Sequence, residues 1–204
     1  MLKWLLSLLA GGLRSSNAPP HLPSRPLPTR RIALVVGHNP RAQGAVRVTD
    51  GRTEYDWCGA LAEQVAALEP GRYVVIRRTP GAGEIARAYA EVDASGATAS
   101  VELHFNSFST PSATGTETLI SGSAASRRLA TLVQAEMVAA LGLRDRGLKQ
   151  TAPKQGGHAA LNAGRPPAIL IEPYFGSNRA DCEAADRSLP ALAAGIHRAC
   201  LAYL

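Results

Sequence analysis

Apolar residues recur along the chain with two periods that alternate with each other. Segments of strand length are predicted at residues 32–36, 73–76, 101–105, 116–120 and 168–171; some are continuous apolar runs, and residues 101–105 alternate apolar with polar residues. Three longer segments instead place apolar residues three or four positions apart, as amphipathic helices do, at residues 57–68, 129–141 and 189–200. Because strands alternate with helices, the pattern predicts an α/β domain with helices packed on a largely parallel sheet.

The strand predicted at residues 101–105 has two different faces. Val101, Leu103 and Phe105 alternate with Glu102 and His104, so one face is expected to be buried and the other to be polar. In α/β proteins with parallel sheets, ligands bind just beyond the carboxyl ends of the strands. Polar residues at predicted strand ends are therefore the first candidates for a functional site.

Residues 1–29 differ in kind from the rest of the chain. Residues 1–17 carry an apolar run after Lys3 that is too short to cross a bilayer, which takes ~20 residues. The run fits the apolar core of a secretory signal, which has roughly 7 to 15 residues. The alternatives are an uncleaved anchor, a helix packed on its own domain, and a helix that contacts a membrane or a partner through residues 1–13. Residues 18–29 are rich in proline and predict a semi-rigid linker, so a single domain is expected at residues 30–204.

The composition is that of one globular domain with a short appendage, because 46% of the 204 residues are hydrophobic and 19% are charged. The net charge of +6 comes mostly from residues 1–31, which hold five basic residues and no acidic one, so the predicted domain is nearly neutral. We therefore expect no nucleic-acid partner, since such a partner requires basic residues clustered on the domain. The three cysteines form no CxxC pair and predict neither a disulfide framework nor a cysteine metal site.

Four polar residues form the candidate site. His38 follows the first strand, His104 lies near the end of the central strand, Glu172 ends the last strand, and Glu54 lies between His38 and the first helix. Taken alone, each has an ordinary structural explanation, such as a hydrogen-bonded histidine or an acid near a helix start. Together, two histidines and one carboxylate are the ligand set of a hydrolytic zinc site, whose chemistry also requires a second carboxylate.

Four sequence blocks, in the same order and at similar intervals, resemble a known family. They are Ile32–His38 with Gly44, Ala45 and Glu54; Val101–Ser107 (VELHFNS); Gly115–Glu117; and Pro167–Glu172 (PAILIE) with Phe175, Ser177, Asn178 and Asp181. These blocks resemble those of the type 3 zinc-dependent N-acetylmuramoyl-L-alanine amidases, which occur in bacterial autolysins and phage endolysins. The resemblance extends from Arg31 to the C-terminus.

The resemblance implies that His38, Glu54 and His104 bind Zn²⁺ and that Glu172 is the catalytic acid and base. It also implies a twisted, mixed sheet between helix layers, as in zinc carboxypeptidases. The expected reaction is hydrolysis of the amide bond between N-acetylmuramic acid and L-alanine, with peptidoglycan as the partner. Two alternatives stay open, namely another zinc peptidase or carboxypeptidase of the same architecture and a wall-binding module without catalysis.

Two segments depart from the family pattern. Asn39-Pro40 replaces the usual glycine-rich turn after the first histidine, which predicts a differently shaped mouth of the site. Glu102 stands where the family often has serine, and it either adds negative charge near the metal or orients a ligand as a hydrogen-bond acceptor. Asp50 and Asp56 lie close to Glu54 in the sequence and compete with it as the carboxylate ligand.

Substrate contacts are expected at Asn106 and His158, although Asn106 can instead support the strand of His104 and His158 can belong to a surface loop. Arg144 and Arg146 are either contacts for the acidic stem peptide or solvated charges. We expect a monomer that is exported to the periplasm or cell wall, or that reaches the envelope as a phage lysis protein.

Overall fold

The computed structural model describes residues 30–204. The predicted apolar segment at residues 1–17 and the predicted linker at residues 18–29 lie outside the described residues. Within residues 30–204, no helix combines the length and the apolar character that crossing a membrane requires.

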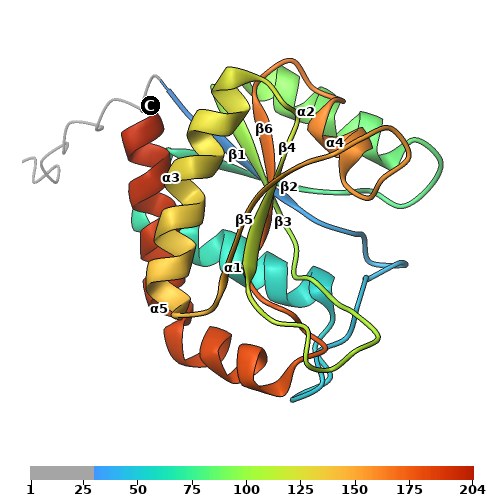
Figure 1. Cartoon of the computed structure of the whole chain (residues 1–204). Coiled ribbons are helices and arrows are strands. Elements are labelled where there is room, and N and C mark those ends of the chain that lie inside the picture. The colour runs from blue at the N-terminus through green and yellow to red at the C-terminus, as the bar shows by residue number, and fades with distance from the viewer. Residues whose placement is uncertain (1–29) are drawn as a thin grey trace, which may run out of the picture.

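The described chain forms six strands and five helices (Figure 1). The strands are β1 (Ile32–Val36), β2 (Tyr73–Arg77), β3 (Ala99–Leu103), β4 (Thr116–Ile120), β5 (Asp145–Gln150) and β6 (Ala168–Glu172). The helices are α1 (Glu54–Leu68), α2 (Glu84–Ser95), α3 (Ala124–Leu141), α4 (His158–Leu161) and α5 (Arg179–Tyr203). The five predicted strands and three predicted helices are confirmed, whereas α2, α4 and β5 were not predicted.

The strands form one mixed sheet in the order β2-β1-β3-β6-β4-β5. Strands β2, β1, β3 and β6 are parallel to one another, whereas β4 pairs with β6 in the antiparallel direction and β5 is parallel to β4. The carboxyl ends of β1, β3 and β6 therefore meet at one edge of the sheet, and the amino end of β4 lies at the same edge. The predicted α/β class and the largely parallel sheet are confirmed.

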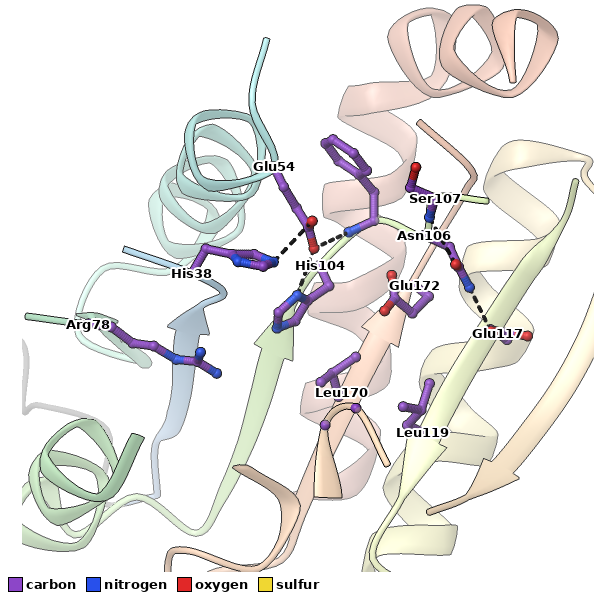
Figure 2. Close-up of a pocket in the computed structure, with 13 residues that line it drawn as sticks. His38, Glu54, Arg78, His104, Asn106, Ser107, Glu117, Leu119, Leu170 and Glu172 are labelled. Atoms are coloured by element: carbon purple, nitrogen blue, oxygen red, sulfur yellow. Dashed lines mark hydrogen bonds and ion pairs between the residues drawn. The ribbon is translucent and has the colours of Figure 1, made fainter. Parts of the chain in front are cut away.

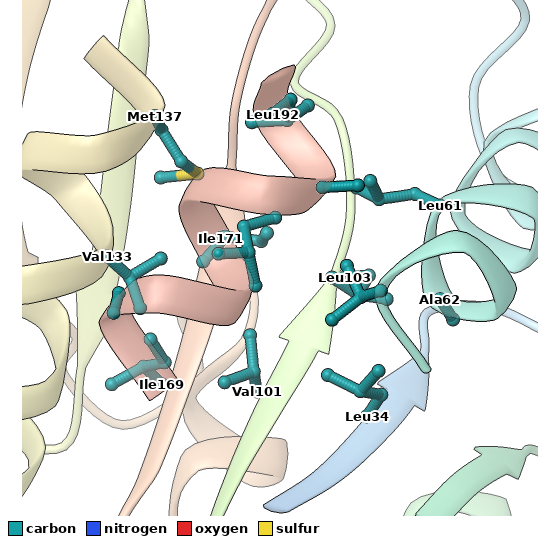
Figure 3. Close-up of a cluster of buried hydrophobic side chains, with 14 of the residues drawn as sticks. Leu34, Leu61, Ala62, Val101, Leu103, Val133, Met137, Ile169, Ile171 and Leu192 are labelled. Atoms are coloured by element: carbon teal, nitrogen blue, oxygen red, sulfur yellow. The ribbon is translucent and has the colours of Figure 1, made fainter. Parts of the chain in front are cut away.

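Helices cover both faces of the sheet, so the domain has three layers. On one face, Leu34, Val101 and Ile171 of the strands pack against Leu61 of α1 and Val133 of α3, together with α5 (Figure 3). On the other face, a smaller cluster of buried residues joins the strands to α2 and α4. This smaller cluster consists of Ala33, Val35, Ile76, Ala88, Tyr89, Val92, Ala97, Ala160, Leu161, Ala168 and Leu170.

Both faces of β3 are buried, although one of them is polar as predicted. Ser100 and Glu102 alternate with Val101 and Leu103, and all four are fully buried. Residues Ser100 and Glu102 lie on the face covered by α2, not by solvent. A carboxylate in this position must find partners inside the protein, because burying an unpaired charge is costly.

Candidate active site

Four chain segments meet at the edge where β1, β3 and β6 end. His38 comes two residues after β1, His104 directly follows β3, Glu172 is the last residue of β6, and Glu54 is the first residue of α1. Their side chains line one cavity of about 460 Å³, into which they point from different elements (Figure 2). The structure thus brings together the four residues of the predicted metal and catalytic site.

His38, Glu54 and His104 form a compact group that can hold a metal ion. Each offers one ligand atom, and these atoms all lie within 4.8 Å of one another. Glu54 lies between the imidazoles, with Oε2 3.0 Å from Nε2 of His38 and Oε1 2.7 Å from Nδ1 of His104. Asp50, a competing candidate, instead forms an ion pair with Arg47 at 2.7 Å, and the group contains neither Asp50 nor Asp56.

The backbone around these side chains fixes the position of the Glu54 carboxylate. The backbone N–H groups of Ala45 and Phe105 donate to its two oxygens, at 3.1 Å and 3.3 Å respectively. Glu54 follows the N-cap residue Thr53, whose side chain accepts a hydrogen bond from the backbone of Asp56. The Glu54 carboxylate is consequently fixed by its place at the start of α1 and by backbone hydrogen bonds from the loop before α1 and the segment after β3.

Two glycines allow the segments to approach this closely. A Cβ atom on Gly37 would lie 2.5 Å from the His104 ring, and one on Gly44 would lie 2.6 Å from both Glu54 Oε2 and the His38 ring. His38 itself has a φ of 64°, in the left-handed region that non-glycine residues seldom adopt. Such a conformation persists only where its surroundings impose it, and it occurs preferentially at functional sites.

Charge interactions within the group shift its pKa values. Burial opposes ionisation of Glu54, but hydrogen bonds from His104 and His38 outweigh it and lower the pKa of Glu54 to about 2. Burial likewise opposes a charge on His104, but Glu102 and Glu54 outweigh it and raise the pKa of His104 to about 10. The buried carboxylate and the imidazoles therefore form a site that favours positive charge between them.

Glu172 is placed differently from these three residues. Its Oε2 atom is buried and has no hydrogen-bond partner among the described residues. Burial of this carboxyl group raises its pKa to about 8, because water no longer stabilises the charged form. Glu172 lies outside the compact group but faces the same cavity (Figure 2), where it is available for proton transfer.

Of the other predicted substrate contacts, Asn106 lines the cavity and His158 does not. The Nδ2 atom of Asn106 donates to Glu117 Oε1 at 2.7 Å. His158, the first residue of α4, is not among the residues that line the cavity, although the preceding Gly156 and Gly157 are. Its Nδ1 lies 3.2 Å from Thr151 Oγ1. Arg146 pairs with Glu117 Oε2 at 2.7 Å and stacks on Phe175.

Arg78 is a cavity residue that the sequence analysis did not identify. It directly follows β2, the neighbour of β1 in the sheet, and lines the same cavity as the histidines. A signal was present in the sequence, since a polar residue after a predicted strand is the pattern that identified His38. Arg78 follows the predicted strand at residues 73–76 and shares that position with the adjacent Arg77.

The donor set of the compact group fits zinc. Two imidazole nitrogens and one carboxylate oxygen are ligands that zinc accepts, and catalytic zinc sites use three protein ligands and keep a further position for water or substrate. The cavity beside the group provides room for that position. No cysteine belongs to the group, and the three cysteines are buried elsewhere in the domain.

The chain is similar in sequence to a family of known enzymes and to a protein of Bacillus subtilis. A family model described as N-acetylmuramoyl-L-alanine amidase matches residues 32–199. The uncharacterized protein YqiI of Bacillus subtilis is 30% identical over 183 residues, covering 87% of this chain and 85% of YqiI.

Solved structures share the fold at lower identity. An N-acetylmuramoyl-L-alanine amidase from Clostridium difficile 630 has a TM-score of 0.72 at 24% identity, over 85% of this chain and 96% of that one. The catalytic domain of the CD27L endolysin targeting Clostridia difficile has a TM-score of 0.73 at 24% identity, over 85% of this chain and 97% of that one. The family match covers the segments that carry all four candidate residues.

Proposed function

The chain belongs to the N-acetylmuramoyl-L-alanine amidase family. We propose that it hydrolyses the amide bond between N-acetylmuramic acid and L-alanine in peptidoglycan. In this proposal His38, Glu54 and His104 hold zinc, and Glu172 is the catalytic acid and base. The family establishes the class of enzyme and substrate, and the cavity geometry supports the roles of individual residues. When bound, zinc polarises the amide carbonyl and lowers the pKa of water to about 7, so that a nucleophile is present at neutral pH.

Glu172 has the position and the environment that proton transfer requires. We infer that it accepts a proton from the attacking water and then donates that proton to the departing amine nitrogen. The second step is required because an amide nitrogen leaves readily only when it is protonated. The free Oε2 atom of Glu172 supports this role, since that atom is not engaged with another residue of the described chain.

The observation that carries this proposal is that one cavity is lined by two carboxyl groups, those of Glu54 and Glu172, whose environments differ. Glu54 is tied to two imidazoles and has a pKa lowered to about 2, whereas the Glu172 carboxyl is unpaired and has a pKa raised to about 8. Carboxylates whose environments separate their pKa values in this way take different chemical roles. Glu54 suits a permanent ligand and Glu172 suits a group that gains and loses a proton.

Substrate contacts and cellular location are further parts of the proposal. Asn106 lies on the cavity wall and supports a substrate contact, whereas the position of His158 supports a contact only through the turn that it follows. The protein acts on the cell wall, and we propose that it reaches the wall as a monomer, either by export to the periplasm or wall or as a phage lysis protein. A role of residues 1–13 at a membrane or a partner stays a prediction.

Digestion of purified peptidoglycan tests the function directly. We expect the full chain loaded with zinc to release peptides with new L-alanine amino termini and glycan with intact lactyl groups, identified by mass spectrometry. Chelation should abolish this release and added zinc should restore it. Release of single C-terminal residues would instead indicate a carboxypeptidase, and wall binding without any cleavage would indicate a binding module.

A further inference from the structure

His104 has a carboxylate on each of its two ring nitrogens. Nδ1 lies 2.7 Å from Glu54 Oε1, and Nε2 lies 2.8 Å from Glu102 Oε1. Glu102 is fully buried, and it is not part of the group whose ligand atoms lie within 4.8 Å of one another. The two nitrogens therefore have different environments, and Nδ1 is the one that contacts Glu54, the carboxylate shared with His38.

Glu102 is itself held by side chains from two other elements. Arg78, which follows β2, pairs with Oε1 of Glu102. The hydroxyl of Tyr89, on α2, donates to Oε2 at 2.7 Å. Tyr89 is 1% exposed and Arg78 is 8% exposed, so the charge pair and its hydrogen bonds are shielded from water. Every oxygen of the buried carboxylate thus has a partner, which is what a buried charge requires.

The same network continues to the turn after His38. Arg78 Nη1 lies 3.8 Å from Glu84 Oε1, and Glu84 Oε2 accepts a hydrogen bond from Asn39 Nδ2 at 2.6 Å. The Asn39 side-chain oxygen in turn accepts from the backbone N–H groups of Arg41 and Ala42 and closes the turn. Asn39 and Glu102, at the two segments that depart from the family pattern, are thereby connected through Arg78 and Glu84.

We propose that Glu102 is a positioning residue that accepts a hydrogen bond from Nε2–H of His104 and so presents Nδ1 to the metal. This inference rests on the proposed zinc site. A metal-bound histidine commonly donates its other ring N–H to a carboxylate, which fixes the tautomer and the ring orientation. Arg78 and Tyr89 hold Glu102 in place, and the positive charge of Arg78 offsets the added carboxylate. Through Glu84 and Asn39, the same network also holds the turn that carries His38.

The geometry argues against Glu102 as an additional ligand. Its Oε1 is shared between His104 Nε2 and Arg78, and its Oε2 is bound to Tyr89. To reach the ion, the carboxylate would have to leave three partners and pass the imidazole ring. Of the two roles that the sequence left open for Glu102, the contacts favour orientation of His104 over crowding of the metal.

Zinc affinity and zinc release measure this role without relying on turnover. We expect Glu102→Gln to weaken zinc binding by about 10- to 100-fold and to speed zinc transfer to a chromophoric chelator, because partners of metal ligands contribute on this scale. Tyr89→Phe removes only the hydroxyl that holds Glu102, so it should produce a smaller change in the same direction. Glu117→Gln is the matched control, since Glu117 lines the same cavity but binds Asn106 and Arg146, and it should leave zinc affinity unchanged.

The nitrogen assignment has a spectroscopic test on the unmodified chain. Long-range ¹H–¹⁵N correlations of the zinc-loaded protein should show His104 with a metal-bound Nδ1 and a protonated Nε2. A metal-bound Nε2 would overturn the inference, and so would zinc affinity in folded Glu102→Gln and Tyr89→Phe equal to that of the parent. If Glu102→Gln does not fold, Tyr89→Phe and the spectrum of the parent decide the question.

The outcomes also separate this inference from the proposed function. Absence of zinc binding by the parent chain would defeat the proposed metal site and with it the role of Glu102. Zinc binding and amidase cleavage by the parent, with unchanged zinc affinity in folded Glu102 and Tyr89 variants, would defeat only the positioning role.

Discussion

Glu172 and Glu54 face one cavity but hold their carboxylates in different ways, one free and one tied to two imidazoles. This difference predicts that Glu172→Gln retains zinc and loses turnover. Since general acid–base catalysis contributes about 100- to 10,000-fold, cleavage should fall by at least about 100-fold. Release of alanine amino termini measures the loss of turnover, and chelator competition measures the retention of zinc. A variant that keeps most of its activity would remove Glu172 from the mechanism.

Gly44 and Gly51 allow backbone strain to be separated from the geometry of the site. Both have positive φ, at 77° and 73°, but a Cβ on Gly44 would meet Glu54 and His38, whereas a Cβ on Gly51 would meet nothing within 4 Å. We expect both alanine variants to lose about 1–2 kcal/mol of unfolding free energy from the left-handed backbone. Only Gly44→Ala should also weaken zinc binding. Equal zinc affinity in the two variants would show that the close approach at Gly44 does not shape the site.

At the scale of single residues, the site residues at strand ends could be predicted from the sequence, but the side chains that contact Glu102 could not. His38, His104 and Glu172 were identified because a parallel sheet brings the carboxyl ends of its strands to one edge. Two partners of Glu102 come from other segments, Arg78 from the residue after β2 and Tyr89 from α2, so their distances from Glu102 depend on packing that periodicity does not specify. The sequence consequently left two roles open for Glu102.

At the scale of elements, the missed segments are those with weak hydrophobic patterns. Strand β5 (Asp145–Gln150) is an edge strand with polar residues and no fully buried side chain, so it lacks the apolar alternation that identifies a strand. Helix α4 has four residues, too few to establish a period. Helix α2 does place Ile85, Tyr89 and Val92 at helical spacing, and that signal was available in the sequence.

The start of α5 offers a prediction about helix capping. Asn178 is the N-cap residue, and its side chain accepts from the backbone of Ala180 and Asp181 and donates to the Ala113 carbonyl. Asn178→Ala should lower the free energy of unfolding by about 0.5–2 kcal/mol, measured by urea denaturation of the metal-free protein. Ser123→Ala, at the N-cap of α3, should have an effect of the same size. No loss of stability in either variant would contradict the capping role.

At the scale of the whole molecule, the proposed metal would link segments that are far apart in the sequence. The three proposed ligand residues come from the loop after β1, the start of α1 and the residue after β3, so an ion bound only by the folded state would stabilise the whole domain. Zinc at about 100 times its dissociation constant should add ~2.7 kcal/mol of unfolding free energy. The thermal midpoint should rise with zinc and fall with chelator in the parent. In His38→Ala the two midpoints should coincide, and a zinc-dependent rise of the parent's size would exclude His38 as a ligand.

The antiparallel pairing of β4 with β6 makes the position of Glu117 depend on the register between these two strands. Glu117 of β4 and Glu172 of β6 are paired in register, so their side chains lie on the same face and both reach the cavity. Side chains alternate along a strand, so a shift of β4 by a single position would turn Glu117 away from Arg146 of β5 and toward the opposite helix layer. A register shift of β4 by two positions would keep Glu117 on the cavity face but would no longer place it opposite Glu172.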